Sequence, residues 1–274
     1  GAPPRGAGRG GHTGSGGAGP TGGGHGWVIG VEVAAGPDGK LRGLRGRVIH
    51  DIGAYSGSGA GQPGISIPNM VSAYVLPAMD IEAELVYTNT VPTGFIRGGG
   101  RPLGNYGMER VIDRLARKLG IEPTTIRQRN MIKPEQIPYT TGIPAGRSGY
   151  VYDSGNYPRL LELAVDKLAY DEEHDRGMDG RLVGYGIACC VESTSFGRGE
   201  PARLRIDKDG TARLFVGSTP QGQGHQTIAA QVAADRLGWP LDKIVVTAGD
   251  TPHVPFALLT PDSRRAAMIG KAPP

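Results

Sequence analysis

The segment TPQGQGHQT, residues 219–227, combines residue types that suit contact with a ligand. Gly222 and Gly224 permit positive φ angles and a close approach of the backbone to a bound group. Gln221 and Gln223 each offer an amide donor pair and an acceptor, which suit the edge of a heterocycle or an oxo group. A helix-like run follows directly, so unpaired N–H groups of its first turn would favour an anion. We therefore predict a ligand-binding loop. The alternative is a tight strand-to-helix connection whose polar side chains bind no ligand.

A second segment, TGFIRGGGRP, places two guanidinium groups around three consecutive glycines. Arg97 and Arg101 flank a run that begins with Gly98 and Gly99, so the backbone can press against a ligand between two positive charges. The alternative is a flexible surface loop with solvated arginines. The first segment, residues 219–227, has the residue order of neither a P-loop nor the dinucleotide-binding fingerprint.

A third segment, TPDSRRA, gathers hydroxyl and guanidinium groups, with Thr260 and Ser263 as its candidate ligand contacts. Its signal is weaker, and a polar turn explains it as well. His225 lacks another His, Cys or carboxylate at metal-ligand spacing, so we interpret it as a hydrogen-bonded loop histidine. The sequence therefore predicts no metal ligand among these side chains.

The composition describes a globular chain with a distinct beginning. The 274 residues are 38% hydrophobic and 20% charged, with a net charge of +4 that is spread along the chain. This balance allows a sizeable core and indicates at most a mild preference for anionic ligands. About half of residues 1–26 are glycine, and we expect this tail to be disordered because it has too few apolar side chains to offset ordering entropy.

The sequence also bears on location. No apolar run approaches the ~20 residues of a membrane span, and the beginning has no signal-peptide pattern, so no membrane partner is expected. The two cysteines, Cys189 and Cys190, are adjacent in a strand-like context. We interpret them as small buried hydrophobes in a reducing cytoplasm.

Hydrophobic periodicity places these segments within a mixed α and β chain. Met108, Val111, Ile112, Leu115 and Leu119 form one helical stripe that ends at Gly120. Strands are predicted at 27–35, 41–55, 81–90, 182–193 and 243–250, with a hairpin over 202–218. Helices are predicted at 68–76, 105–120, 122–132, 157–170 and 228–238. The elements show no regular βαβ rhythm, so α+β is favoured over a doubly wound sheet. No internal repeat is evident, and the Pro- and Gly-rich stretch 133–155 is a plausible boundary.

Taken together and in this order, the motifs resemble the molybdenum hydroxylase family. The resemblance is to the large, molybdopterin-binding subunit of xanthine dehydrogenase, aldehyde oxidase and carbon monoxide dehydrogenase-like enzymes. It rests on YTNTVPTGFIRGGGRP, MERVIDRLARKLGIEPTTIRQRNMI, GEPARLRIDKDG, GSTPQGQGHQTIAAQVAADRLG and VVTAGDT, and it spans roughly residues 27–260.

The resemblance implies a molybdopterin cofactor, either as such or as the cytosine dinucleotide, that hydroxylates aldehydes or N-heterocycles with water-derived oxygen. Iron–sulfur (2Fe-2S) clusters and FAD are then expected on partner subunits and not on this chain. It implies two molybdopterin-binding lobes of mixed sheets and packed helices, with the second incomplete. We place the first lobe at 27–135 and the second at 136–274, after the tail 1–26.

Residue by residue, the resemblance places Arg97 beside the molybdenum centre, on the loop with Gly98 and Gly99. It implies that Gly222, Gln223 and Gly224, with Gln221 before them, bring backbone and amide groups to the pterin. Thr260 and Ser263 fall where the family has a small-residue cofactor segment.

The chain also departs from the family pattern. Asp262 would place a carboxylate near an anionic cofactor, which weakens the match there. The catalytic glutamate of the family lies beyond the equivalent of residue 274, so the chain is expected to be a fragment that is inactive alone. The rival reading is a non-catalytic interaction protein or fold remnant. A variant of that reading gives the RG-containing tail weak RNA binding, but it holds only two arginines, and no nucleic-acid partner is expected.

Overall fold

A computed structural model describes residues 26–143, 150–168, 184–193, 201–220 and 222–254. The chain divides after Glu192 into two compact units, and each is considered by itself. The lobe boundary predicted between residues 135 and 136 remains a prediction. No helix in the described part of the chain has both the length and the apolar character that crossing a membrane requires.

The sheet of the first unit contains a hairpin and one parallel strand. β1 (Trp27–Ala35) and β2 (Leu41–Gly53) pair antiparallel, as predicted, through a turn in which Gly39 adopts a φ of +78°. β3 (Met79–Tyr87) pairs parallel to β2, so the order is β1-β2-β3. The mixture of both pairings confirms the predicted α+β class.

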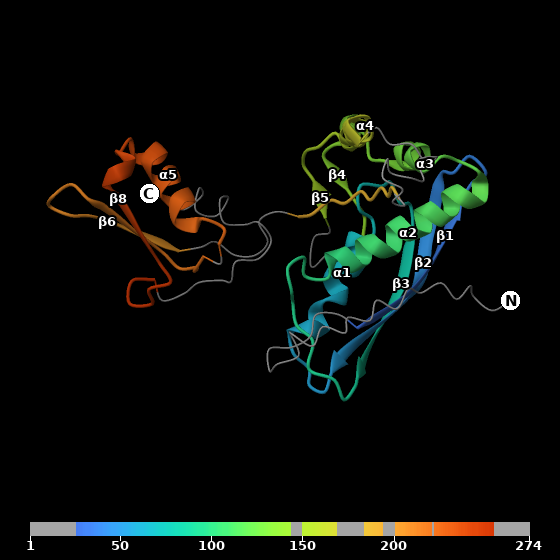
Figure 1. Cartoon of the computed structure of the whole chain (residues 1–274), viewed down its shortest axis with the longest axis horizontal. Helices are drawn as coiled ribbons and strands as arrows, with labels where there is room; N and C mark the ends of the chain where they lie inside the picture. Colours follow the sequence, from blue (N-terminus) through green and yellow to red (C-terminus); the bar gives the residue numbers. More distant parts are fainter. Residues whose placement is uncertain (1–25, 144–149, 169–183, 194–200, 221, 255–274) are drawn as a thin grey trace, which may run out of the picture. The chain divides into compact units, whose positions relative to one another are not determined.

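Helix α2 (Arg101–Leu119) runs across one face of this sheet (Figure 1). It begins four residues before the predicted start, because Pro102 suits the first turn of a helix, and it ends at Gly120 as predicted. The predicted apolar stripe faces the core, where Met108 is fully buried and Ile112 is 2% exposed. Gly107 lets the helix approach Ile29, since an added Cβ would lie 3.2 Å from the Ile29 side chain.

The remaining elements of the first unit are shorter. α3 follows α2 closely and begins at Pro123 as predicted. α1 begins at Pro63, which sits at the first helical position, and ends at Asn69. The elements are η1 (Ser58–Gly61), α1 (Pro63–Asn69), α3 (Pro123–Asn130), η2 (Pro134–Gln136), β4 (Tyr139–Thr140), β5 (Val151–Tyr152) and α4 (Tyr157–Leu168).

Two predictions for the first unit are wrong. The helix predicted at 68–76 lies at 63–69 instead, and the chain then turns, with Ser72 at a φ of +49°. Residues 184–193 form no strand. The carbonyl of Cys189 accepts from Ser72 Oγ at 2.6 Å, and that of Ile187 accepts from Arg127 at 2.9 Å. Side chains therefore take the acceptors that a neighbouring strand would use.

A buried ion-pair network joins α2 to α3. The Arg127 side chain is fully buried and donates from Nε to Glu109 Oε2 at 2.9 Å and from Nη2 to Asp113 Oδ1 at 2.8 Å. Tyr74 Oη donates to the other Glu109 oxygen at 2.7 Å. Burial raises the pKa of Glu109 above its ordinary value, while the Arg127 guanidinium works to lower it. Glu109 lies in the third turn of α2.

The sheet of the second unit has the same strand connectivity as the β1-β2-β3 sheet of the first. β6 (Ala202–Ile206) and β7 (Ala212–Val216) form the predicted hairpin, and β8 (Ile244–Ala248) pairs parallel to β7. α5 (His225–Leu237) connects β7 to β8 and packs on the sheet, and η3 (Leu241–Lys243) precedes β8 (Figure 1). The core here is small, with Leu214, Val216 and Ala229 at its centre.

Both units therefore contain a hairpin whose second strand continues through a helical connection into a parallel third strand. The sequence shows no evident internal repeat that would have predicted this similarity. In sheets with parallel strands, ligands commonly bind beyond the carboxyl ends of those strands. Each unit has one such edge. Residues 94–100 follow it in the first unit, and residues 222–224 follow it in the second.

Candidate functional site

The Arg97 loop, defined as residues 94–100, follows the carboxyl end of β3. A hydrogen bond joins the segments that follow β2 and β3, because the backbone N–H of Ala54 donates to Thr90 O at 3.0 Å. Asp51, near the end of β2, accepts from the Thr88 hydroxyl at 2.6 Å. The loop thus leaves the sheet from a fixed edge.

Buried polar side chains hold both ends of the Arg97 loop. Gln62 Nε2 donates to the carbonyl of Gly94 at 2.6 Å, and Ser66 Oγ donates to that of Gly100 at 2.7 Å. Gln62 and Ser66 are fully buried and lie one helical turn apart at the start of α1. Sequence reasoning missed these two anchors, since a Gln and a Ser four residues apart carry no signal of what they will contact.

Three consecutive glycines of the loop adopt left-handed backbone angles. The φ values of Gly98, Gly99 and Gly100 are +100°, +57° and +90°. Side chains other than glycine rarely adopt such angles, so this backbone path requires the glycines. Arg97 is exposed at the start of the run. Arg101, by contrast, is 8% exposed and has a guanidinium nitrogen 3.6 Å from Glu192, so only one of the two predicted guanidinium groups is presented to solvent.

The second loop lies between β7 and α5. Gly222 and Gly224 have φ values of +102° and +72°, and no atom lies within 4 Å of the position that a Cβ would take at either. Gly224 is the N-cap of α5 and has no side chain with which to cap the first-turn N–H groups. The exposed backbone of residues 222–224 is therefore open to a flat or anionic group.

The turn after β8 packs against the start of this second loop. The N–H of Gly249 donates to Val216 O at 2.9 Å, and a Cβ at Gly249 would lie 2.3 Å from the Thr219 side chain. Beyond it, His253 Nδ1 lies 3.0 Å from Asp250 Oδ2, and the His253 ring stacks on Phe215 with centroids 4.1 Å apart. The loops at the carboxyl ends of β7 and β8 thus form one surface.

His225 is the first residue of α5 and is 1% exposed. It therefore supports the loop from within the second unit. Within the described ranges, no group of three or more His, Cys, Asp or Glu side chains could hold a metal ion directly.

The predicted site residues belong to both units. Arg97, Gly98 and Gly99 lie together in the first, and Gly222, Gln223 and Gly224 lie together in the second. Gln221, Thr260 and Ser263 lie outside the described residues.

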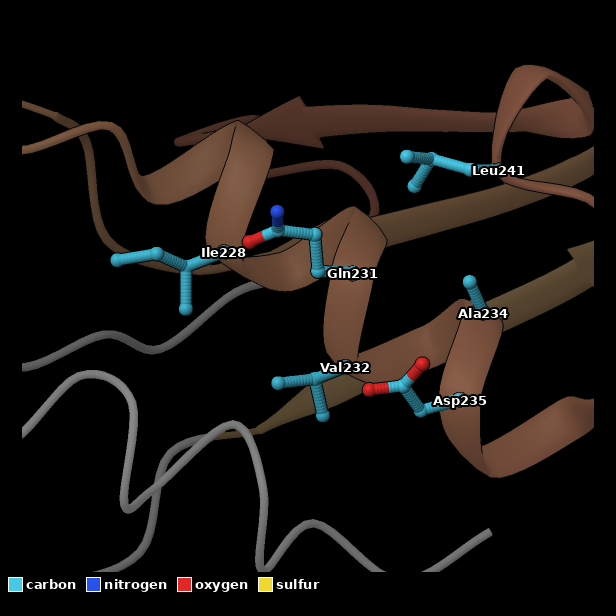
Figure 2. A pocket seen from close by; sticks show the side chains of 6 residues that line it. All are labelled: Ile228, Gln231, Val232, Ala234, Asp235 and Leu241. Carbon is cyan, nitrogen blue, oxygen red and sulfur yellow. The ribbon is translucent and has the colours of Figure 1, made fainter.

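A shallow cavity of about 450 Å³ lies along α5 and away from the predicted loops. Five α5 residues and Leu241 line it, and Ile228, Val232 and Leu241 supply its apolar part (Figure 2). None of the predicted site residues that the structure describes lines this cavity. The exposed glycine loops, and not this cavity, carry the features expected of a cofactor site.

Comparison with known proteins is consistent with this arrangement. Residues 19–131 match one model of a molybdopterin cofactor-binding domain, and residues 161–273 match a second. The carbon monoxide dehydrogenase large chain of Hydrogenophaga pseudoflava is 34% identical over 88% of this chain and 32% of its own length. The nicotine 6-hydroxylase large subunit of Paenarthrobacter nicotinovorans is 31% identical over 90% of this chain and 32% of its own length.

Among solved structures, quinoline 2-oxidoreductase from Pseudomonas putida 86 is similar with a TM-score of 0.79. It is 30% identical, and the match covers 91% of this chain and 34% of that one. The chain thus spans about a third of the length of the relatives that it matches.

Proposed function

We propose a function from the premise that this chain belongs to the molybdopterin-binding large subunits of the molybdenum hydroxylases. It holds part of a molybdenum–pterin cofactor in an oxidoreductase subunit. The Arg97 loop of the first unit and residues 222–224 of the second unit each bind part of this cofactor.

The glycine backbone at residues 222–224 is the observation that carries this proposal. Both Gly222 and Gly224 have left-handed φ angles and open space where a side chain would stand. A planar pterin needs such close backbone approach, and the uncapped N-terminus of α5 suits the phosphate of the cofactor. The amide of Gln223 would add a directional hydrogen bond. Gly222, Gln223 and Gly224 therefore fit a molybdenum–pterin cofactor.

Arg97 supplies the positive charge of the first unit. Its side chain is exposed, and the left-handed glycines after it hold the backbone in a path that other residues would resist. A guanidinium at this place would orient and stabilise an anionic cofactor or substrate oxygen. Thr260 and Ser263 remain proposed contacts of the same cofactor.

The molybdenum centre, when bound, supplies the chemistry of hydroxylation with water-derived oxygen. The role of the protein is to bind and orient this centre and to exclude competing reactions. We propose an aldehyde or an N-heterocycle as the substrate. The names of the nicotine- and quinoline-acting relatives favour the N-heterocycle.

Electrons from such a reaction require acceptors. We propose that iron–sulfur and FAD subunits receive them, since the relatives are named as large chains or large subunits. The two free cysteines suit a reducing compartment such as the cytoplasm.

The test is the metal and pterin content of the full chain, expressed in cells that synthesise the cofactor. Mass spectrometry of the purified protein should find molybdenum and pterin in a fixed ratio to the chain. Gly222→Ala should lower both contents several-fold, because φ at +102° disfavours a side chain and the new methyl group would occupy the ligand space.

Gly210→Ala is the matched control. Gly210 also lies in the second unit, with a φ of +80° and no atom within 4 Å of an added Cβ, but it belongs to the β6–β7 turn. The two variants should lose similar stability, and only Gly222→Ala should lose cofactor. An unmodified chain without molybdenum would overturn the proposal and favour a non-catalytic fold remnant.

A further inference from the structure

Among the described residues, three cations and no carboxylate line a cavity of about 330 Å³ in the first unit. Lys40 comes from the turn between β1 and β2, Arg129 from the last turn of α3, and Lys133 from the segment that follows. None of the three forms an ion pair with a residue in the described part of the chain. Asp38 and Glu135 are their sequence neighbours but do not line the cavity.

The floor of this cavity is rigid. Asn130 is 5% exposed, and its side chain donates to Gly39 O at 2.8 Å and accepts from the Leu41 N–H at 2.9 Å. These bonds fasten the β1–β2 turn to the end of α3. Leu41 and Met131 also line the cavity and are buried, so the backbone that carries the three cations is held in place. A preformed wall lowers the entropy that a ligand must lose on binding.

The guanidinium of Arg129 is oriented as well. Its Nη1 donates to the carbonyl of Asp38 at 2.7 Å, which leaves its other N–H groups without a partner among the described residues. The planar donors of Arg pair well with phosphate oxygens, and a lysine ammonium acts as a point charge beside them. Three cations around one hollow repel one another, and a bound anion removes that cost.

We propose that this cavity binds a small phosphate-bearing molecule with at least two negative charges. Its volume of about 330 Å³ lies at the lower end of the range for small-molecule sites. The site shares no residue with the two proposed cofactor loops, so its existence does not depend on the proposed function.

The probe is pyrophosphate, titrated into the full chain by calorimetry without magnesium and at constant ionic strength. We expect saturable binding to one site per chain. Lys40→Ala, Arg129→Ala and Lys133→Ala should each weaken binding about tenfold, because each removes one charge-assisted contact. Citrate, with similar charge but no phosphate, should bind at least several-fold more weakly.

The control removes three positive charges elsewhere in the first unit, more than any single site variant removes. Arg114, Arg117 and Lys118 are exposed on α2, and their triple alanine variant should bind pyrophosphate within about twofold of the unmodified chain, since salt screens distant charges. An equal loss of affinity in this variant would show diffuse attraction and overturn the site. Absence of saturable binding, or citrate binding as tightly as pyrophosphate, would overturn it too.

A second measurement needs no variant. Acetylation of the unmodified chain, followed by peptide mass spectrometry, reports the accessibility of each lysine. Pyrophosphate should slow the acetylation of Lys40 and Lys133 several-fold and leave that of Lys118 unchanged. If pyrophosphate left the acetylation rates of Lys40 and Lys133 unchanged, the proposal would be overturned.

Discussion

Replacing Arg127 with methionine should destabilise the first unit strongly, because it removes the buried cation that pairs with the Glu109 carboxylate. The Arg127 side chain is fully buried and that of Glu109 is 5% exposed. Without Arg127, the Glu109 carboxylate keeps the Tyr74 hydroxyl, at 2.7 Å, as its one remaining side-chain partner. Breaking a buried ion pair from one side costs about 3–5 kcal/mol, most of it from the uncompensated charge that stays behind.

The pH dependence supplies a second signature. Burial already raises the pKa of Glu109, and loss of the guanidinium should raise it further. A carboxyl group with a raised pKa in the folded state favours folding when protonated. The Arg127→Met variant should therefore be least destabilised near pH 4, where the unfolded chain also binds this proton, and should lose stability as the pH rises through the folded pKa of Glu109.

Urea unfolding followed by Trp27 fluorescence measures this effect, with Trp239→Phe as the background so that the signal reports the first unit alone. Adding Glu109→Gln to Arg127→Met should restore most of the lost stability and remove the excess pH dependence, because no buried charge remains. Arg114→Met, at an exposed position of α2, is the control and should change stability by less than about 0.5 kcal/mol. A cost below about 1 kcal/mol for Arg127→Met at pH 7, or identical pH profiles for the single and double variants, would refute the reasoning.

Three further outcomes are expected. Gly104→Ala should destabilise the α1–α2 contact by about 2 kcal/mol or more in thermal unfolding, because its Cβ would lie 2.0 Å from Ser66 O. Gly64→Ala, with no atom within 4 Å, should be neutral or slightly stabilising, and equal effects would contradict the packing argument. Ser66→Ala should make the Arg97 loop several-fold more sensitive to limited proteolysis, since Gly100 O loses its 2.7 Å donor; an unchanged cleavage rate would argue against anchoring. Iodoacetamide at pH 8 should modify exposed Cys190 well before Cys189, whose thiol pKa burial raises to about 11, and peptide mass spectrometry would expose the reverse order.

Several elements could be predicted because their signals are local. The apolar stripe from Met108 to Leu119 and the stop at Gly120 lie within one helix, and the DKDG turn lies within one hairpin. The motifs around Arg97 and Gly222 likewise stand in continuous stretches, so the two loops and their family could be proposed from residue order alone.

The absence of the predicted strand and the burial of Glu109 share one physical cause, which is contact between segments far apart in the chain. Residues 182–193 alternate like a strand, but the carbonyls of Ile187 and Cys189 bond to Arg127 and Ser72, 60 and 117 residues away. A glutamate within a helix is usually exposed. Here α3 places Arg127 against Glu109, and both side chains are buried. No local pattern contains a partner that arrives from so far along the chain.

The sequence by itself determined the strands and helices with strong periodicity, the α+β class and the family, because each rests on side chains that are neighbours in the chain. Tertiary structure alone decided that both units pair their third strand parallel, and that the Arg97 loop and residues 222–224 lie beyond the carboxyl ends of such pairs. It also decided which arginine is exposed: Arg97 is presented to solvent, while Arg101 packs at the start of α2 near Glu192. Pairing and burial are long-range, since they depend on which distant segments exclude water from a given side chain.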